Sequence, residues 1–479
     1  MLSNTLDPTP PPEHKRHVVL VPFMSKSHTI TLLHLARLLL KRHLSVTIFT
    51  TRANRPFIVD TLADTSASIV DLPFPENIPD IPPGIESTDK IPSMSLFYSF
   101  VTSTKRMQPD FERALQSLLP HVSFMVSDGF LWWTLESASK FGIPRLVSYG
   151  MCAYANSVCI AAHQDRLLHG PKSDTELITV TRFPWIQITR NDFDPPFTDP
   201  EPDPVVSEFH MNCAIATMSS FGTIFNSFYE LEPVFVDFSN QLDGQRESET
   251  KAWCVGPLCL ADPVPRFQQS PSNKPAWFQW LDQKREQGRS VLYVAFGSQA
   301  EISTEQIGEI AMGLEESKVN FLWVIRKRES ELSDGFEERV KGRGIVVRDW
   351  VEQRKILMHE SVQGFLSHCG WNSVLESICA GVPILAWPMM AEQPLNARMV
   401  VEEIKVGLRV ETCDGSVRGF VKWEGLKKMV KELMEGELGK EVRKKVKEVA
   451  EMARKAMEDG GSSWRALDSL IDKICNCKQ

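Results

Sequence analysis

The sequence has no long apolar run, no CxxC cysteine pair and no excess of basic residues. Its longest apolar candidate, residues 30–40, is interrupted by His34 and Arg37, so it falls short of the roughly 18 apolar residues that a membrane-spanning helix needs. The first 16 residues are polar and proline-rich and lack the order of a secretory signal. The formal net charge of −8 offers no electrostatic basis for binding nucleic acid. We therefore expect a cytoplasmic protein with no membrane span and no nucleic-acid partner.

The spacing of the cysteines and the absence of two motifs bear on disulfides, metals and cofactors. The ten cysteines are scattered, which favours reduced thiols over a disulfide framework. The closest pair, Cys475 and Cys477, has no histidine or third cysteine near it in sequence, so we expect no metal site there. No GxGxxG motif follows an expected strand, which argues against a dinucleotide-dependent oxidoreductase. No DxD motif stands in a plausible metal-binding setting, and we expect neither a metal nor another cofactor.

The length of 479 residues exceeds what one hydrophobic core usually serves, which predicts two domains. In each half, short β-branched runs alternate with helical patterns, and this alternation predicts parallel sheets. The expected strands are 17–22, 45–50, 123–127, 145–148 and 222–226 in the first half, and 290–295, 320–325, 344–347, 363–367 and 383–386 in the second.

Polar stretches rich in proline and serine separate the two halves. The predicted organisation is therefore a disordered lead-in at 1–16, a first domain at 17–250, a linker at 251–276, a second domain at 277–459 and a last helical segment at 460–479. A long helical stretch is expected at 93–119, and a charged one at 422–457 ends before Gly460-Gly461, where glycines suit a helix stop.

The hexapeptide HCGWNS at 368–373 is open to three interpretations. Metal binding by His368 and Cys369 is disfavoured because adjacent strand residues point to opposite faces, and the same geometry disfavours a Cys369 nucleophile. In the third interpretation, Gly370 permits a tight turn between a strand and a helix that starts at Asn372 or Ser373. Such a helix start, at the carboxyl end of a parallel strand, can bind an anion. Taken alone, the motif fits an ordinary capped turn equally well.

The hexapeptide belongs to a longer pattern at 350–393, which resembles the signature box of plant family 1 UDP-dependent glycosyltransferases. The matching positions are Trp350, Gln353, His368–Ser373, Glu376, Gly381–Pro383, Pro388 and Glu392-Gln393. Glu352 stands where the family usually has proline, a change that should alter a loop and not the contacts. Segments 226–232, 255–257 and 460–463 also look like the family, so the resemblance covers almost the whole chain after residue 16.

The resemblance implies residues for the nucleoside and the sugar of a UDP-sugar donor. Trp350 would stack on the uracil ring, Gln353 would bond the ribose region and Glu376 would accept hydrogen bonds from the ribose hydroxyls. Glu392 and Gln393 are left for the sugar hydroxyls. Gln393 favours glucose, since the family often has histidine at this position for galactose.

The resemblance also implies how the diphosphate is held. His368, Asn372 and Ser373 would supply side-chain donors, and the main chain near Trp371 would assist. Ser298, which follows an expected strand, resembles the phosphate-contacting Gly-Ser turn of the family, although the same residues suit an ordinary turn. With UDP stabilised by the helix start and His368, the transfer would need no metal.

A base is required because an alcohol is a weak nucleophile at neutral pH. His28 lies in the loop after the first strand, where an isolated histidine is more often a cap or a surface group. The loop resembles the family segment whose final histidine is the general base, although Met24, Lys26 and Ser27 replace the usual Pro, Gln and Gly. Asp128, at the end of another expected strand, resembles the aspartate that orients that histidine and balances its charge.

Together these features imply the GT-B arrangement, in which two facing Rossmann-like domains enclose a cleft and a C-terminal helix crosses back to the first domain. The implied activity is an inverting transfer of glucose from UDP-glucose to a hydroxyl of a small phenolic or otherwise lipophilic plant metabolite, by a monomer. We expect the acceptor pocket in segments 78–98 and 185–197. The alternatives are a non-catalytic nucleotide-sugar-binding protein, which the presence of both His28 and Asp128 disfavours, and the same transferase with another UDP-sugar.

Overall fold

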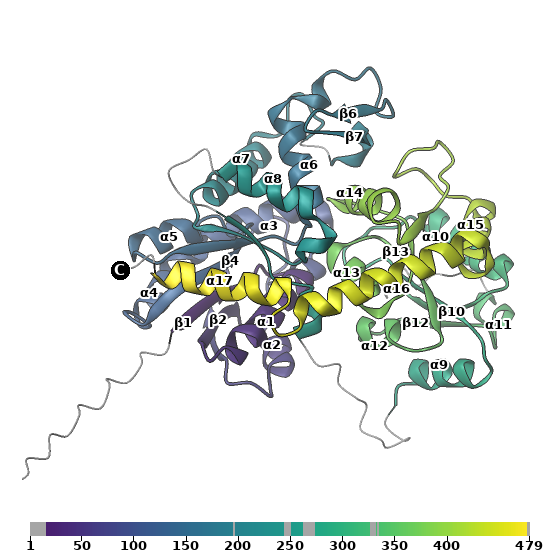
Figure 1. Cartoon of the computed structure of the whole chain (residues 1–479), viewed down its shortest axis with the longest axis horizontal. Coiled ribbons are helices and arrows are strands. Elements are labelled where there is room, and N and C mark those ends of the chain that lie inside the picture. The colour runs from purple at the N-terminus through teal and green to yellow at the C-terminus, as the bar shows by residue number, and fades with distance from the viewer. Residues whose placement is uncertain are drawn as a thin grey trace, which may run out of the picture.

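The computed structural model describes residues 16–194, 197–243, 251–261, 274–325, 332 and 335–476. Residues 1–15 of the expected lead-in and Cys477 lie outside these ranges. Within them the chain forms two α/β domains, each built on a parallel sheet (Figure 1). Residues of both domains line one cleft. No helix in this part of the chain is both long and apolar enough to cross a bilayer.

The sheet of the first domain has the strand order β3-β2-β1-β4-β5-β8-β9. Its strands are β1 (His17–Val21), β2 (Ser45–Thr51), β3 (Ser68–Leu72), β4 (Val122–Asp128), β5 (Arg145–Ser148), β8 (Gly222–Phe225) and β9 (Lys251–Cys254). Its helices are α1 (Lys26–Lys41), α2 (Arg55–Thr61), α3 (Phe97–Ser103), α4 (Gln108–Gln116), α5 (Thr134–Lys140), α6 (Ala153–Gln164), α7 (Pro204–Met218) and α8 (Pro233–Asp243). Successive residues of β1 enter two different apolar cores, as expected for a parallel sheet covered on both faces.

The sheet of the second domain has the order β12-β11-β10-β13-β14-β15. Its strands are β10 (Val291–Ala295), β11 (Asn320–Val324), β12 (Gly344–Val347), β13 (Val362–Ser367), β14 (Ile384–Ala386) and β15 (Gly407–Arg409). Its helices are α9 (Ala276–Glu286), α10 (Thr304–Ser317), α11 (Phe336–Arg339), α12 (Gln353–Leu357), α13 (Trp371–Ala380), α14 (Gln393–Arg398), α15 (Trp423–Glu435) and α16 (Glu437–Met457). A π-helical turn, Met399–Glu403, follows α14.

Both sheets have a topological switch point, where the strand order reverses. In the first, β1 lies between β2 and β4, and Val21 pairs with Ser127. In the second, β10 lies between β11 and β13, and Ala295 pairs with Ser367. Ligands of open α/β sheets bind in the crevice beyond such strand ends. The loops after β1, β4, β10 and β13 are therefore placed by topology to build one site.

The last helix, α17 (Ser462–Asn476), returns to the first domain after α16 (Figure 1). Its apolar face, Leu467, Leu470, Ile471 and Ile474, joins the core formed by α1 and the first sheet. Arg42 of α1 bonds the carboxylate of Asp468 at 2.6 Å, and its guanidinium lies 3.9 Å from the ring centre of Trp464. The predicted GT-B arrangement, including the returning C-terminal helix, is confirmed.

The domain boundary at residue 250 needs a correction. Strand β9, inside the range expected to be a linker, pairs with β8 as the edge strand of the first sheet. Short strands at sheet edges carry weak periodicity, and β3 and β15 were missed for the same reason. The antiparallel hairpin of β6 (Ile178–Val180) and β7 (Phe183–Ile188) was missed as well.

Two long helical stretches are divided in the structure. The stretch expected at 93–119 contains α3, a 3-10 turn at Thr104–Met107 and then α4, whose first turn holds Pro109. Proline lacks an N–H and therefore suits a helix start and not a helix interior. The stretch expected at 422–457 is two helices, α15 and α16, which meet at Gly436 in an extended conformation with ψ of 172°.

Candidate active site

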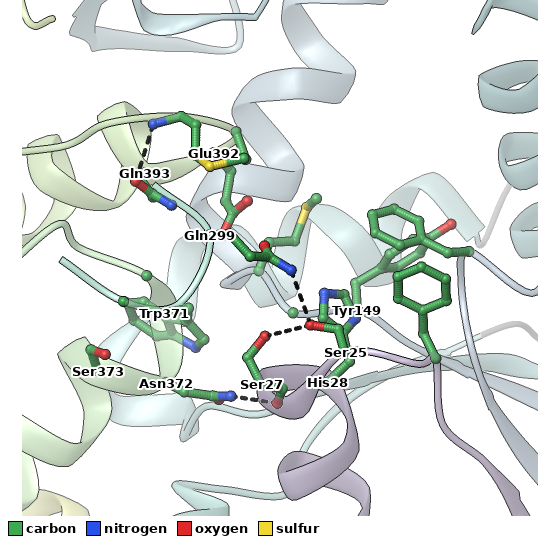
Figure 2. Close-up of a pocket in the computed structure, with 18 of the residues that line it drawn as sticks. Ser25, Ser27, His28, Tyr149, Gln299, Trp371, Asn372, Ser373, Glu392 and Gln393 are labelled. Carbon is green, nitrogen blue, oxygen red and sulfur yellow. Dashed lines mark hydrogen bonds between the residues drawn. The ribbon is translucent and has the colours of Figure 1, made fainter. Parts of the chain in front are cut away.

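A cleft with a cavity volume of about 2620 Å³ lies at the carboxyl ends of both sheets. It is lined by every residue predicted for the site except Asp128, namely His28, Ser298, Trp350, Gln353, His368, Trp371, Asn372, Ser373, Glu376, Glu392 and Gln393. Figure 2 shows His28 and residues of the hexapeptide converging on this cleft from the two domains. Residues more than 300 positions apart in sequence therefore share one cavity.

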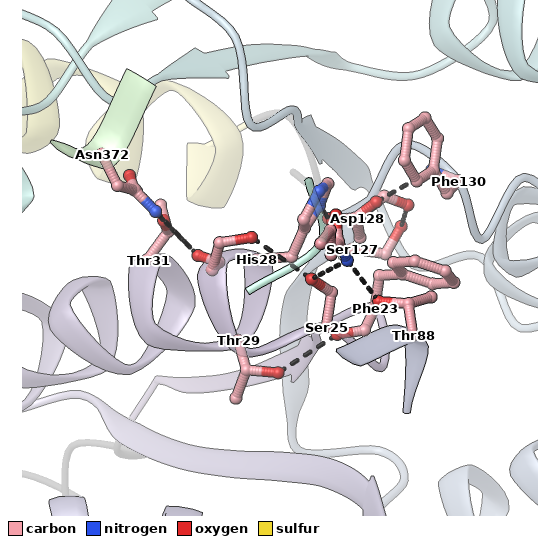
Figure 3. A network of polar contacts seen from close by, with 12 residues as sticks. Phe23, Ser25, His28, Thr29, Thr31, Thr88, Ser127, Asp128, Phe130 and Asn372 are labelled. Carbon is pink, nitrogen blue, oxygen red and sulfur yellow. Dashed lines mark hydrogen bonds and ion pairs between the residues drawn. The ribbon is translucent and has the colours of Figure 1, made fainter. Parts of the chain in front are cut away.

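His28 and Asp128 form a direct hydrogen bond. Nδ1 of His28, in the first turn of α1, lies 2.7 Å from Oδ2 of Asp128, the last residue of β4 (Figure 3). Oδ1 of Asp128 accepts the backbone N–H of Phe130 at 2.9 Å, which holds the carboxylate in place. With Nδ1 engaged, Nε2 is the ring nitrogen left for a proton from a substrate.

The surroundings of His28 act on its pKa in opposite directions. Burial lowers the pKa, whereas the charge and hydrogen bond of Asp128, together with the charge of Glu392, raise it. The attraction prevails, so the pKa of His28 lies above its ordinary value. A higher pKa makes the imidazole a better proton acceptor once it is neutral.

Access to Nε2 depends on the absence of a side chain at residue 150. A Cβ at Gly150 would lie 3.4 Å from both Nε2 and Cε1 of His28. The hydroxyl of Tyr149, next to Gly150 in sequence, bonds Oγ1 of Thr217 at 2.7 Å. Gly150 lines the cleft and leaves space beside Nε2, a feature that sequence reasoning had not identified.

The turn between β13 and α13 differs in detail from the prediction. Cys369, not Gly370, has the left-handed backbone, with φ of 62°, and its Sγ contacts the carbonyl of Ser367 at 3.6 Å. Gly370 is needed for space, since a Cβ there would lie 2.6 Å from Nε2 of His368. A Cβ at Gly297, in the turn after β10, would meet the same atom at 2.6 Å.

His368 thus lies between two glycine backbones and lines the cleft. Burial lowers its pKa to about 4, although the backbone carbonyl of Ala295 raises it slightly. The ring is therefore neutral near pH 7. Ser298, after Gly297, is exposed to the cleft.

Gln353 organises the polar groups around α13. Its Nε2 donates to Oγ of Ser373 at 2.9 Å and to Oε2 of Glu376 at 2.7 Å, and its Oε1 accepts from the hydroxyl of Tyr293 at 3.2 Å. Burial raises the pKa of Glu376, which the bond from Gln353 and the charge of Arg354 partly offset. Trp350, 66% exposed, presents its ring at the edge of the cleft.

Asn372 and Trp371 contact the first domain. Nδ2 of Asn372 donates to the carbonyl of Ser27 at 2.8 Å and to Oγ1 of Thr31 at 3.0 Å. Its Oδ1 accepts from Nδ2 of Asn226 at 3.0 Å. Nε1 of the buried Trp371 donates to the carbonyl of Asn226 at 2.7 Å. Asn372 therefore joins helix α13 to the first turns of α1, which carries His28, and both residues join α13 to Asn226 after β8.

Glu392 and Gln393 begin α14 at the cleft. Oε1 of Gln393 accepts the backbone N–H groups of Met389 and Met390 at 3.0 and 3.1 Å, which fixes the amide so that Nε2 is its remaining donor. Burial raises the pKa of Glu392, opposed mainly by a helix-terminal backbone hydrogen bond and by the charge of His28. Oε1 of Glu392 also accepts a bond from Asn396 at 3.3 Å.

Gln299 is a cleft residue that sequence reasoning missed. Its Nε2 donates to Oγ1 of Thr88 at 2.6 Å and to Oγ of Ser25 at 3.4 Å, so it links the turn after β10 to the N-cap of α1, the helix that carries His28 (Figure 2). The only sequence feature that could have indicated a place for Gln299 in the cleft is its position directly after Ser298. A side-chain bond between residues more than 200 positions apart cannot be read from local pattern.

The two segments expected to hold the acceptor both reach the cleft in part. Met94, Phe97 and Tyr98 come from the first segment, and Phe193 and Phe197 from the second. Helix α7, which was not expected there, adds a third wall that includes Phe209, His210 and Cys213. Its residues look like an ordinary apolar helix in sequence, so nothing local marked them.

The fold and the site together define a GT-B glycosyltransferase, with a donor side in the second domain and a histidine–aspartate pair in the first. Comparison with known proteins leads to the same class of enzyme. Residues 270–448 match the family model described as UDP-glucoronosyl and UDP-glucosyl transferase. Over 97% of this chain and 98% of the relative, the sequence is 58% identical to UDP-glycosyltransferase 90A1 of Arabidopsis thaliana. The chain belongs to the plant family 1 UDP-glycosyltransferases, enzymes that transfer sugar from a UDP-sugar to small acceptors.

Solved structures show the same fold. UGT73P12 of Glycyrrhiza uralensis, in complex with glycyrrhetinic acid 3-O-monoglucuronide, is 30% identical with a TM-score of 0.84, over 97% of this chain and 96% of that one. UGT2 of Phytolacca americana, in complex with UDP-2fluoro-glucose and pterostilbene, is 29% identical with a TM-score of 0.77, over 96% of this chain and 99% of that one.

Proposed function

We propose that this enzyme transfers glucose from UDP-glucose to a hydroxyl of a small phenolic or otherwise lipophilic plant metabolite, with inversion and with His28 as general base. The observation that carries the proposal is the 2.7 Å bond between His28 and Asp128, at the edge of the cleft shared with α13. Nε2 of His28 takes the acceptor proton as the acceptor oxygen attacks the anomeric carbon. The bond from that carbon to the diphosphate oxygen breaks, and its electron pair leaves with UDP.

On the donor side, the exposed Trp350 ring offers a stacking surface for uracil. Glu376, oriented by Gln353, faces the cleft as an acceptor for the ribose hydroxyls. Nε2 of Gln393 is directed by its bonded Oε1, which suits donation to a sugar hydroxyl. The choice of glucose over galactose rests on glutamine at this position.

The leaving diphosphate needs its growing charge stabilised. The start of α13 presents backbone N–H groups at the cleft, and His368, Ser373 and Ser298 line the same region. We propose that these groups suffice and that transfer requires no metal. Activity that survives dialysis against a chelator would support this part of the proposal, and activity lost to the chelator and restored by a divalent cation would refute it.

The acceptor side is lined by apolar and aromatic residues, among them Phe23, Phe97, Phe130 and Phe209. Such walls suit a flat apolar compound, and the structural relative from Phytolacca americana has a phenolic stilbene, pterostilbene, in its complex. Both substrate sides are built by one chain, which is consistent with a functional monomer.

The test is incubation with UDP-glucose, or separately UDP-galactose, and a panel of plant phenols, with mass spectrometry of the products. We expect a mass gain of one hexose, and NMR of the product should show the β-anomer formed from the α-linked donor. His28→Ala should abolish transfer while calorimetry shows UDP binding unchanged. Binding of UDP-glucose without transfer to any phenol would instead favour the non-catalytic alternative.

A further inference from the structure

The acceptor side of the cleft ends in an aromatic group that includes a polar pair. We call it the distal cluster: Phe97, Tyr98, Phe197, Phe209 and His210, contributed by α3, α7 and the segment before α7. Ring centres of Tyr98 and Phe209 are 5.9 Å apart, and those of Phe197 and His210 are 5.1 Å apart. All five side chains line the same cavity as His28.

The polar pair is Tyr98 and His210. The hydroxyl of Tyr98 lies 3.0 Å from Nε2 of His210, and both side chains are half-buried. Burial lowers the pKa of His210, so the ring is neutral near pH 7 and its Nε2 can accept the phenol proton. Burial, with the charge of Asp194 next, raises the pKa of Tyr98 to about 12, so the phenol stays protonated.

The pair keeps unused hydrogen-bonding capacity on the side of the cavity. Within the described part of the chain, neither side chain has another hydrogen-bond partner. The phenol oxygen of Tyr98 can still accept a bond, and Nδ1–H of His210 can still donate one. A neutral group that both accepts and donates, such as a hydroxyl, complements the two. The charge of Asp194, which is paired with Arg418, also acts on Tyr98.

A continuous aromatic wall joins the base to this pair. The ring of His28 lies 5.3 Å from Phe130, Phe130 lies 5.8 Å from Phe209, and Phe209 lies 5.3 Å from His210, all measured between ring centres. An acceptor that lies along this wall with one hydroxyl at Nε2 of His28 extends its other end toward Tyr98 and His210. Three ring-to-ring steps correspond to an elongated molecule of two or more linked rings.

We propose that Tyr98 and His210 form a second recognition point for the acceptor, and that they select elongated aromatic compounds with a neutral hydroxyl or carbonyl at the end opposite the glucosylated hydroxyl. This inference rests on the proposed function and narrows its substrate class. The pair is a specificity element and takes no part in the proton transfer at His28.

The test compares two acceptors that differ only at the far end: 4,4′-dihydroxystilbene and 4-hydroxy-4′-methylstilbene. The diol has two equivalent hydroxyls, so a twofold preference is statistical. Beyond that factor, we expect kcat/KM for the diol to be about threefold to tenfold higher, since a neutral hydrogen bond contributes that much. Equilibrium binding of both compounds to the enzyme with UDP, measured by calorimetry, should show the same preference without requiring turnover.

The deciding variants are Tyr98→Phe and His210→Phe, which keep an aromatic ring and remove the polar atoms. Each should abolish the preference for the diol while transfer to the methyl compound stays within about twofold. Tyr229→Phe makes the same chemical change outside the cleft, where the hydroxyl bonds Asp237, and should keep the preference.

A preference of the wild type for the diol that does not exceed the statistical factor of two, in kcat/KM and in binding, would overturn the inference, and so would a larger preference that persists in both variants. Absence of transfer to any phenol, with the diol still bound preferentially, would refute the proposed function and leave the recognition point supported. The two failures are therefore distinguishable.

Discussion

Nδ2 of Asn372 donates a hydrogen bond of 2.8 Å to the carbonyl oxygen of Ser27, the residue directly before His28. Asn372 lies in the first turn of the helix expected to cradle the diphosphate, and Ser27 lies in the first turn of the helix that carries the base. The bond therefore connects donor binding to base placement. The same Nδ2 also donates a hydrogen bond of 3.0 Å to Oγ1 of Thr31, in the same helix as Ser27 (Figure 3).

Loss of this connection should impair turnover more than donor binding. For Asn372→Ala we expect kcat to fall by roughly tenfold to a hundredfold, because a misplaced base loses the attack geometry. The Kd of UDP should change less than threefold. Thr31→Val removes the partner hydroxyl and should lower kcat in the same direction, whereas Thr31→Ser keeps it and serves as the control. A large loss of UDP affinity in Asn372→Ala with kcat intact would instead identify a diphosphate ligand only.

The pH dependence of activity should report the state of His28. The ring must be neutral to accept a proton, so kcat/KM should fall as the pH drops through the pKa of His28, which lies above its ordinary value. In Asp128→Asn the raising charge is gone and burial remains, so the acidic limb should move to lower pH. The plateau should fall by roughly 10²- to 10⁴-fold. An acidic limb that does not move in the variant would show that another group titrates.

Substitution at Gly150 should close the approach to the base. In Gly150→Ala, a Cβ at 3.4 Å from Nε2 of His28 would touch the base and take up space in the cleft beside it. We expect kcat/KM for a phenolic acceptor to fall by about tenfold or more, since a small misplacement of reactants is costly. Hydrolysis of UDP-glucose by water, a smaller nucleophile, should fall less. Gly308→Ala, where the added Cβ meets nothing within 4 Å, is the matched control.

Gln393→Glu separates the two functions of this side chain. Glutamate keeps an oxygen for the N–H groups of Met389 and Met390 but removes the Nε2 donor that we propose binds the sugar. The KM for UDP-glucose should rise by about threefold to tenfold, the loss of one neutral hydrogen bond, with the Tm nearly unchanged. A KM equal to that of the wild type would exclude donation by Gln393 to the sugar.

The two domains also share a buried ion pair. Nε of Arg398 lies 2.9 Å from Oδ1 of Asp192, with side chains 8% and 0% exposed. Asp192→Ala leaves the guanidinium without this partner and should lower the free energy of unfolding by about 3–5 kcal/mol. The measurement is urea denaturation. Glu437→Gln breaks the exposed pair with Lys440 and should cost less than about 1 kcal/mol. Similar small effects for both would show that the Asp192 pair contributes little.

Local pattern was enough for the two-domain α/β architecture. The strands at 145–148 and 344–347 were predicted at the observed bounds, the strand at 123–127 is one residue longer at each end, and the other expected strands differ by one residue at one end. Buried parallel strands are continuous β-branched runs, which makes them the easiest elements to recognise. The edge strand β9 was missed because its sequence, KAWC, carries no such run, whereas the edge strand β12 was found because GIVV does.

The sequence by itself determined which residue types stand at the ends of the central strands, and its resemblance to a known family predicted His28, Asp128 and the hexapeptide as site residues. Tertiary structure alone decided their partners: that Nδ1 of His28 meets Asp128, that Asn372 bonds Ser27, and that Tyr98 meets His210 on another helix. The physical reason is that a strand end specifies a place in a sheet locally, whereas a side-chain contact across a cleft depends on how two domains pack. Such packing is set by many distant residues at once.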